Sequence, residues 1–197
     1  LRAVLGLEGP GLAERVPVDE RELLARAGLL AMRPLRAAAL EGALASLFEL
    51  DVEVEQFVPA WFEIDADDRA RLGRANTTLG RDLSLGGSVC LVEPRFRLRL
   101  GPVSWDRYRG LLPGTEGFLA LVSIVRLAVG AELDFDVRVL LDGASVPELR
   151  LRGRGEGAPR LGYSSWLRRE ATDAPVDQAL FHCTAADVPA TSGGAPR

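Results

Sequence analysis

Two carboxylates in one short segment are the first residues of this sequence that could do chemistry together. Glu53 and Glu55 alternate with apolar residues in the stretch 51–57, so a strand there would place both on one face. Paired carboxylates can act as general acid and base. No lysine, metal-ligand spacing or nearby histidine accompanies them, because the chain has no lysine and its one histidine is His182. We interpret the pair as a charged strand face and His182 as a surface residue.

The other reactive side chains also lack the neighbours that catalysis needs. Ser164 and Ser165 have no G-x-S-x-G setting, and the glycine-rich stretch 73–87 lacks the G-K-[ST] ending of a phosphate loop. Cys90 and Cys183 lie far apart without C-x-x-C spacing, which favours buried free thiols and leaves a disulfide between them open. We therefore predict no catalytic, cofactor-binding or metal-binding residues, and an enzyme is not expected.

Three arginines alternate with three apolar residues near the middle of the chain, in the run Arg-Phe-Arg-Leu-Arg-Leu. A strand there places Arg95, Arg97 and Arg99 on one face and turns the apolar face to a core. The arginine face needs carboxylates, and those of the segments 51–57 and 134–141 are available on neighbouring strands. The alternative partner is an acidic chain, so these arginines are candidate residues for cross-strand or cross-subunit pairing.

The segment that follows adds two candidate anchors. Gly101-Pro102 is expected to end the strand, because proline has no amide hydrogen to donate to a ladder. Trp105 and Trp166 are either interface anchors, as tryptophan is enriched at binding hot spots, or core residues. With the three arginines they complete the set of candidate interface residues.

Composition narrows the class of protein. The 197 residues are 47% hydrophobic and 26% charged, a globular mixture, and the net charge is -4. Because the chain is mildly acidic and the three arginines form the largest basic stripe, nucleic-acid binding is not expected. No apolar run approaches the length of a membrane-spanning helix, so no direct membrane insertion is expected.

Hydrophobic periodicity predicts an α+β fold, with short N-terminal helices followed by mixed, mainly antiparallel strands packed on one or two apolar helices. Helices are predicted over 19–32, 34–48, 105–112 and 115–129, and strands over 51–57, 95–100, 134–141 and 161–167. Ser104 and Thr115 are predicted helix caps, and Gly130 an αL terminator. The loop 73–87 is expected to be packed by Leu79, Leu83 and Leu85. The predicted division is a helical segment over 1–50, an α+β domain over 51–169 and a disordered tail over 170–197.

The order of these segments resembles the TssG baseplate subunit of the bacterial type VI secretion system. The matching residues are Ala27-Gly28-Leu29-Leu30-Ala31 with Arg33-Pro34, Val54-Glu55-Gln56-Phe57 with Trp61, Arg74-Ala75-Asn76 with Leu79-Gly80, Phe96-Arg97-Leu98-Arg99-Leu100-Gly101-Pro102, Leu112-Pro113-Gly114, Val125-Arg126 with Val129-Gly130, Glu132-Leu133-Asp134-Phe135-Asp136-Val137, and Leu161-Gly162-Tyr163-Ser164-Ser165-Trp166-Leu167. The family is longer at its N-terminus, so we expect this chain to correspond to its C-terminal portion.

The resemblance implies a structural role without catalysis or cofactor. TssG-like subunits join TssF-like chains in the baseplate wedge, contact a TssE-like subunit and receive TssK-like trimers. The implied location is the cytoplasm, at a baseplate docked on the inner membrane. The alternatives are a free-standing protein-binding module and a degenerate TssG fragment without an assembly role.

Overall fold

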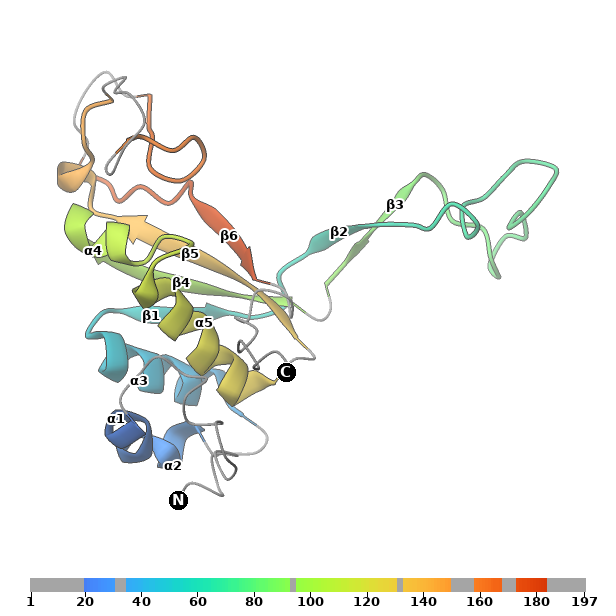
Figure 1. The fold of residues 1–197 in the computed structure, drawn as a ribbon. Coiled ribbons are helices and arrows are strands. Elements are labelled where there is room, and N and C mark those ends of the chain that lie inside the picture. Colours follow the sequence, from blue (N-terminus) through green and yellow to red (C-terminus); the bar gives the residue numbers. More distant parts are fainter. Residues whose placement is uncertain are drawn as a thin grey trace, which may run out of the picture. The chain divides into compact units, whose positions relative to one another are not determined.

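The computed structural model describes residues 20–30, 35–92, 95–130, 133–149, 158–167 and 173–183 (Figure 1). They fall into two compact units. Unit 1 comprises Leu1–Gln56 and Phe96–Arg197, and unit 2 comprises Phe57–Arg95. The division predicted at residues 50 and 169 stays a prediction.

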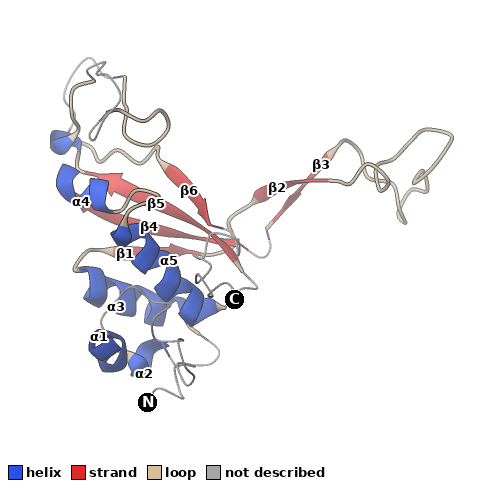
Figure 2. Ribbon diagram, in the orientation of Figure 1, coloured by secondary structure: helices blue, strands red, loops and turns tan. Residues whose placement is uncertain are grey.

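Unit 1 contains a four-stranded sheet in the order β1-β4-β5-β6 (Figure 2). Its strands are β1 (Val52–Glu55), β4 (Arg95–Val103), β5 (Asp134–Leu141) and β6 (Leu180–Cys183). β1 pairs antiparallel with β4, and β6 antiparallel with β5. Contacts between β4 and β5 advance together along both strands, from Arg97 with Asp136 to Val103 with Asp142, so these two run in the same direction. The sheet is therefore mixed, and the predicted α+β class is confirmed.

The helices of unit 1 are α1 (Glu20–Ala25), α2 (Ala27–Leu30), α3 (Ala37–Phe48), α4 (Trp105–Gly110) and α5 (Glu116–Val129). In Figure 1, α5 crosses in front of the sheet, and α3 packs against both β1 and α5. Most of α5 is buried, which agrees with its apolar sequence. The core joins the inner sheet face to these helices, through residues such as Phe96, Leu98, Leu100, Phe135, Val137, Val139, Leu40, Leu44, Leu121, Ile124 and Val125.

Helix boundaries follow the sequence in part. Thr115 caps α5 as predicted, because its side-chain oxygen accepts a hydrogen bond from the Phe118 amide. Ser104 occupies the predicted N-cap position of α4, and its carbonyl accepts from the Tyr108 amide, but its side chain makes no capping hydrogen bond. The single helix predicted over 19–32 is two short ones, interrupted at Arg26, whose guanidinium bonds the Glu22 carbonyl and Ser46 of α3.

The end of α5 is held by a buried arginine. Gly130 has φ 90° and ψ −170°, which is not the predicted αL conformation. Arg126 instead donates from Nη1 to the Leu133 carbonyl at 2.5 Å and from Nη2 to the Cys183 carbonyl at 3.0 Å. Its guanidinium also lies 4.8 Å from the centroid of the Phe135 ring. One side chain therefore ties α5 to β5 and β6.

The strand β4 does not end at Gly101-Pro102, contrary to the sequence prediction. The Gly101 amide donates to the Asp51 carbonyl, and the Val103 carbonyl accepts from the Asp142 amide, so the ladder continues past the proline. Gly101 has φ +103°, and a Cβ atom there would lie 2.7 Å from the Leu140 carbonyl oxygen. Only glycine fits this close approach of two strands.

The C-terminal part of the structure differs most from the sequence prediction. The predicted edge strand over 161–167 is a turn followed by an irregular segment. No ordered element was expected beyond residue 169, yet β6 forms there, because Phe181 and Cys183 turn inward to the core. The end of the predicted tail, residues 184–197, lies outside the described residues. Cys183 is buried but Cys90 is exposed, and both are free thiols, so only one of them matches the buried environment expected.

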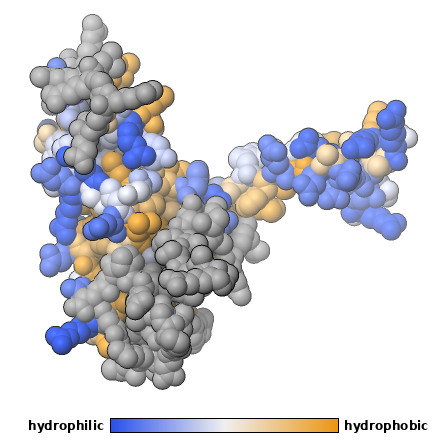
Figure 3. All heavy atoms as spheres, in the orientation of Figure 1, coloured by the Kyte–Doolittle hydropathy of each residue, from blue (hydrophilic) through white to orange (hydrophobic). Residues whose placement is uncertain are grey.

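Unit 2 is an antiparallel ribbon of β2 (Ala60–Glu63) and β3 (Ser88–Leu91), joined by a long segment of turns. The ladder extends to Ile64, whose amide donates to the Gly87 carbonyl. Leu79 and Leu85 were expected to pack the connecting loop, but they are 86% and 84% exposed. Figure 3 shows hydrophobic residues at the surface of unit 2 among hydrophilic ones.

Candidate functional site

The charged face of the sheet is a row of side chains, one from each strand. Glu55 on β1, Arg97 on β4, Asp136 on β5 and His182 on β6 lie side by side, because Glu55 is opposite Arg97 and Asp136 is opposite His182 in the strand registers. Arg97 Nη1 lies 3.5 Å from Glu55 Oε2, and Nη2 lies 3.2 Å from Asp136 Oδ2. The other Asp136 oxygen, Oδ1, lies 2.7 Å from His182 Nδ1.

The centre of this row is buried. The Asp136 side chain is 2% exposed, whereas His182 is 60% exposed, as expected of a surface residue. A buried carboxylate is stable only when paired and hydrogen-bonded, and Arg97 with His182 supply those contacts. Two carboxylates thus share one guanidinium, an arrangement that fastens β1, β4, β5 and β6 together. It presents no nucleophile with a base.

The predicted cross-strand contacts form for Arg97 and Arg99. Arg97 pairs with Glu55 and Asp136, and Arg99 Nη1 lies 3.0 Å from Glu53 Oε2. Arg95 is the first residue of β4 and the last residue of unit 2, and within that unit its carbonyl accepts a hydrogen bond from the Val58 amide. A role for these residues at a subunit interface stays a prediction.

The two predicted tryptophan anchors lie together. Trp105 stacks on Tyr108 with ring centroids 5.8 Å apart, and Trp166 meets Trp105 edge-on at 6.1 Å. Tyr108 is fully buried and donates from its hydroxyl to the Tyr163 carbonyl at 2.5 Å. Burial raises the pKa of Tyr108. Both tryptophans are only partly buried, so each keeps surface available.

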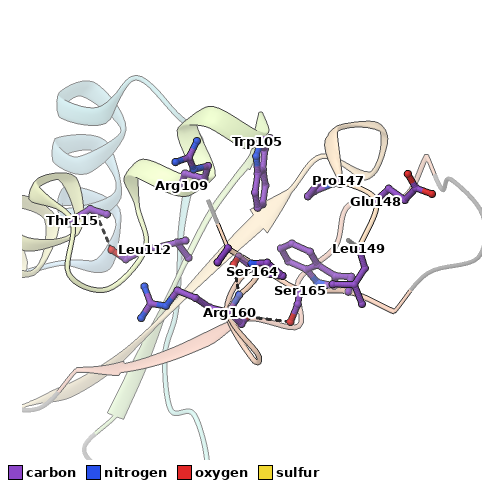
Figure 4. A pocket seen from close by; sticks show the side chains of 13 residues that line it. Trp105, Arg109, Leu112, Thr115, Pro147, Glu148, Leu149, Arg160, Ser164 and Ser165 are labelled. Atoms are coloured by element: carbon purple, nitrogen blue, oxygen red, sulfur yellow. Dashed lines mark hydrogen bonds between the residues drawn. The ribbon is translucent and has the colours of Figure 1, made fainter. Parts of the chain in front are cut away.

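A pocket of about 530 Å³ opens beside this aromatic cluster (Figure 4). Its wall comes from α4, from the segment 147–149 and from the segment 158–166. Sequence reasoning found its two tryptophans but not its arginines, Arg109 and Arg160. The i, i+4 spacing of Trp105 and Arg109 on α4 was a usable signal, whereas Arg160 is distant from α4 in the sequence. The described lining residues are Trp105, Arg109, Leu112, Thr115, Pro147, Glu148, Leu149, Ala158, Pro159, Arg160, Ser164, Ser165 and Trp166.

Unit 2 carries large apolar side chains that its own ribbon does not cover. Trp61 on β2 is 73% exposed, Phe57 is 70% exposed, and Leu91 on β3 is about half exposed. A two-stranded ribbon has too few layers to bury both of its faces. Trp61 entered the sequence analysis only as part of a motif. Trp61 and Phe62 are consecutive, and a strand turns consecutive side chains to opposite faces, which was a usable signal.

The described ranges contain neither a candidate metal site nor a membrane-spanning helix. No cluster of three or more histidine, cysteine or acidic side chains within them could hold a metal ion. None of the helices in that part of the chain is both long and apolar enough to cross a bilayer.

These features define a small α+β protein whose sheet charges are paired internally and whose apolar side chains remain available in unit 2 and around the pocket. The family described as type VI secretion, TssG, matches residues 1–168. The chain belongs to the TssG family. Among curated proteins no match was found.

Two solved structures have the same fold. A chain in the cryo-electron microscopy structure of a type VI secretion TssK-TssF-TssG baseplate subcomplex superposes with a TM-score of 0.75 at 20% identity, covering 92% of this chain and 76% of that one. A chain in a structure of the type VI secretion baseplate complex gives 0.60 at 20% identity, covering 90% of this chain and 51% of that one. At this identity the likeness is one of fold.

Proposed function

We propose that this chain is a structural subunit of a type VI secretion baseplate wedge, where it binds TssF-like and TssK-like chains. The observation that carries the proposal is the exposure of large apolar side chains on both faces of the unit 2 ribbon, with Trp61 on one face and Leu91 on the other, and Phe57 close by in the sequence. Exposed apolar patches of this kind mark surfaces that another protein covers. Family membership and the fold shared with a chain of a TssK-TssF-TssG complex support this assignment.

The finer parts of the proposal concern neighbours and place. The chain also contacts a TssE-like subunit, and it works in the cytoplasm at a baseplate docked on the inner membrane. Its role is to hold other chains in position, with no catalytic step and no cofactor. Internal pairing of Arg97 and Arg99 supports a division of labour, in which unit 1 is the scaffold and unit 2 offers binding surface.

Co-purification tests this proposal. The chain is expressed alone and together with TssF-like and TssK-like chains, and we expect soluble yield to rise with the partners because they cover the exposed apolar side chains. Trp61→Ser should reduce recovery of the partners several-fold while leaving the melting temperature unchanged, because the side chain is mostly exposed.

Two variants serve as controls. Trp61→Phe keeps an aromatic anchor and should retain most of the binding. Arg97→Glu places a third acidic group beside Glu55 and Asp136, so it should lower the melting temperature of the chain itself. A soluble chain that ignores both partners, or a Trp61→Ser variant that recovers them fully, would contradict the assignment and favour a free-standing module.

A further inference from the structure

The pocket beside the aromatic cluster has walls that are fixed before any ligand arrives. Trp166 is wedged edge-on against both Trp105 and Tyr108, with centroid distances of 6.1 Å and 5.5 Å. The hydroxyl of Tyr108 is anchored on the Tyr163 carbonyl, which fixes the ring between α4 and the turn 161–164. Rigid aromatic walls bind at low entropic cost, because few rotamers have to be frozen.

The rim of the pocket favours an acidic ligand. Arg109 is exposed, and within the described part of the chain its guanidinium makes no hydrogen bond or ion pair. Arg160 stacks on Tyr163, with its guanidinium carbon 4.5 Å from the ring centroid, and Nη1 donates to the Pro113 carbonyl at 3.4 Å. Glu148 is the acidic residue among the described lining residues, so two positive groups face one negative group. This excess complements a carboxylate.

Apolar surface continues on the segment that forms one wall. Leu161 follows Arg160 and is 93% exposed, and Leu167 follows Trp166 and is 96% exposed. A small ligand confined to about 530 Å³ would leave these side chains in water. A longer segment of polypeptide can fill the pocket and cover them together, which is the more favourable use of the apolar area.

We propose that this pocket binds an extended segment of another protein chain, which presents an apolar or aromatic side chain to Trp105 and Trp166 and a carboxylate to Arg109. This proposal depends on the proposed function in one respect, namely that the bound segment belongs to another chain of the assembly. It concerns unit 1 and is separate from the apolar surface of unit 2.

Tryptophan fluorescence gives a direct test, because the chain has three tryptophans and two of them line the pocket. In the full chain carrying Trp61→Phe, only Trp105 and Trp166 report. The probe is the capped peptide Gly-Asp-Phe-Asp-Leu-Gly, compared with the same peptide carrying lysine for aspartate and with phenylacetate. We expect a saturable emission change with a Kd below about 1 mM for the acidic peptide, and at least tenfold weaker binding of the lysine peptide.

Charge reversal at the rim locates the site. Arg109→Glu should weaken binding of the acidic peptide about tenfold, and Arg36→Glu, an exposed reversal in unit 1 away from the lining residues, should leave it unchanged. Equal binding of both peptides, no saturable change up to 1 mM, or phenylacetate binding as tightly as the peptide would each overturn the proposal. Co-purification with TssF-like and TssK-like chains is measured in parallel, so a failure of the pocket is distinguishable from a failure of the assembly role.

Discussion

Unit 1 and unit 2 differ in how far their apolar side chains are buried. Unit 1 buries its apolar residues in one core and pairs the charges of its sheet face, with Asp136 enclosed between Arg97 and His182. Unit 2 is a ribbon whose Trp61 and Leu79 lie mostly in water. The stability of the chain therefore resides in unit 1, and the surface that most needs a partner resides in unit 2.

The arginines of β4 and the exposed apolar side chains of unit 2 are both candidates for an interface. The arginine stripe of β4 has the composition expected of a binding surface, but Arg97 and Arg99 use their charges within the sheet. Apolar side chains of unit 2 have no such internal use. Under the proposed function, an exposed apolar residue of a two-stranded ribbon is a better indication of a binding surface than a run of like charges.

The largest expected effect is the difference in lost stability between the two units when one leucine is truncated in each. Leu98→Ala on β4 removes a fully buried side chain and should lower the free energy of unfolding by about 3 kcal/mol. Leu79→Ala in unit 2 removes an exposed side chain and should change it by less than about 0.5 kcal/mol. Urea unfolding followed by circular dichroism measures both. Similar losses in the two variants would mean that unit 2 is packed as tightly as unit 1.

A smaller effect tests the charged row of the sheet. Asp136→Asn removes the charge that faces Arg97 and His182 and should cost about 2 kcal/mol, since Arg97 keeps only Glu55 as a partner in this row. Asp177→Asn breaks the partly exposed pair with Arg138 and is the matched control, with an expected cost below about 1 kcal/mol. Both costs are measured by urea unfolding at neutral pH. Equal costs would show that the buried Asp136 contributes no more to stability than the partly exposed Asp177.

Local patterns predicted most of unit 1 because each depends on few neighbours. The alternation at 95–100 and 134–141 gave β4 and β5, and the charges at 53 and 55 gave the pairing of β1 with Arg97 and Arg99. A period of two fixes which side chains share a face, and opposite charges then select the neighbouring strand.

The remaining features depend on residues distant in the sequence. β6 is a four-residue strand that forms only because β5 offers it an edge, and Asp136 offers His182 a partner. β4 continues past Pro102 because its neighbours on both sides are hydrogen-bonded. The Gly101 amide donates to Asp51, just before β1, and the Val103 carbonyl accepts from Asp142, just after β5. The pocket joins α4 to segments about forty to sixty residues away, as in Arg109 with Arg160, so no local window contains it.

The smallest effect concerns the pH dependence of the stability of unit 1. The sequence of unit 2 contains no tyrosine, so tyrosine titration reports on unit 1 alone. Burial raises the pKa of Tyr108 above its ordinary value of 10.0. The folded state thus keeps this proton where the unfolded state loses it. The resulting stabilisation is fully present below about pH 10, and it is lost as the pH rises toward the raised pKa, by at most about 1.4 kcal/mol per pH unit.

Tyr108→Phe separates this titration from all others. At pH 8 the variant should be about 1 kcal/mol less stable, because the Tyr163 carbonyl loses its hydroxyl donor. Above pH 10 its free energy of unfolding should fall less steeply than that of the unchanged chain, so the two curves approach each other. Tyr163→Phe keeps Tyr108 and should retain the steeper fall. Parallel curves for Tyr108→Phe and the unchanged chain from pH 8 to 11 would mean that the hydroxyl reaches water, and that the aromatic wall of the pocket is looser than the packed core of unit 1.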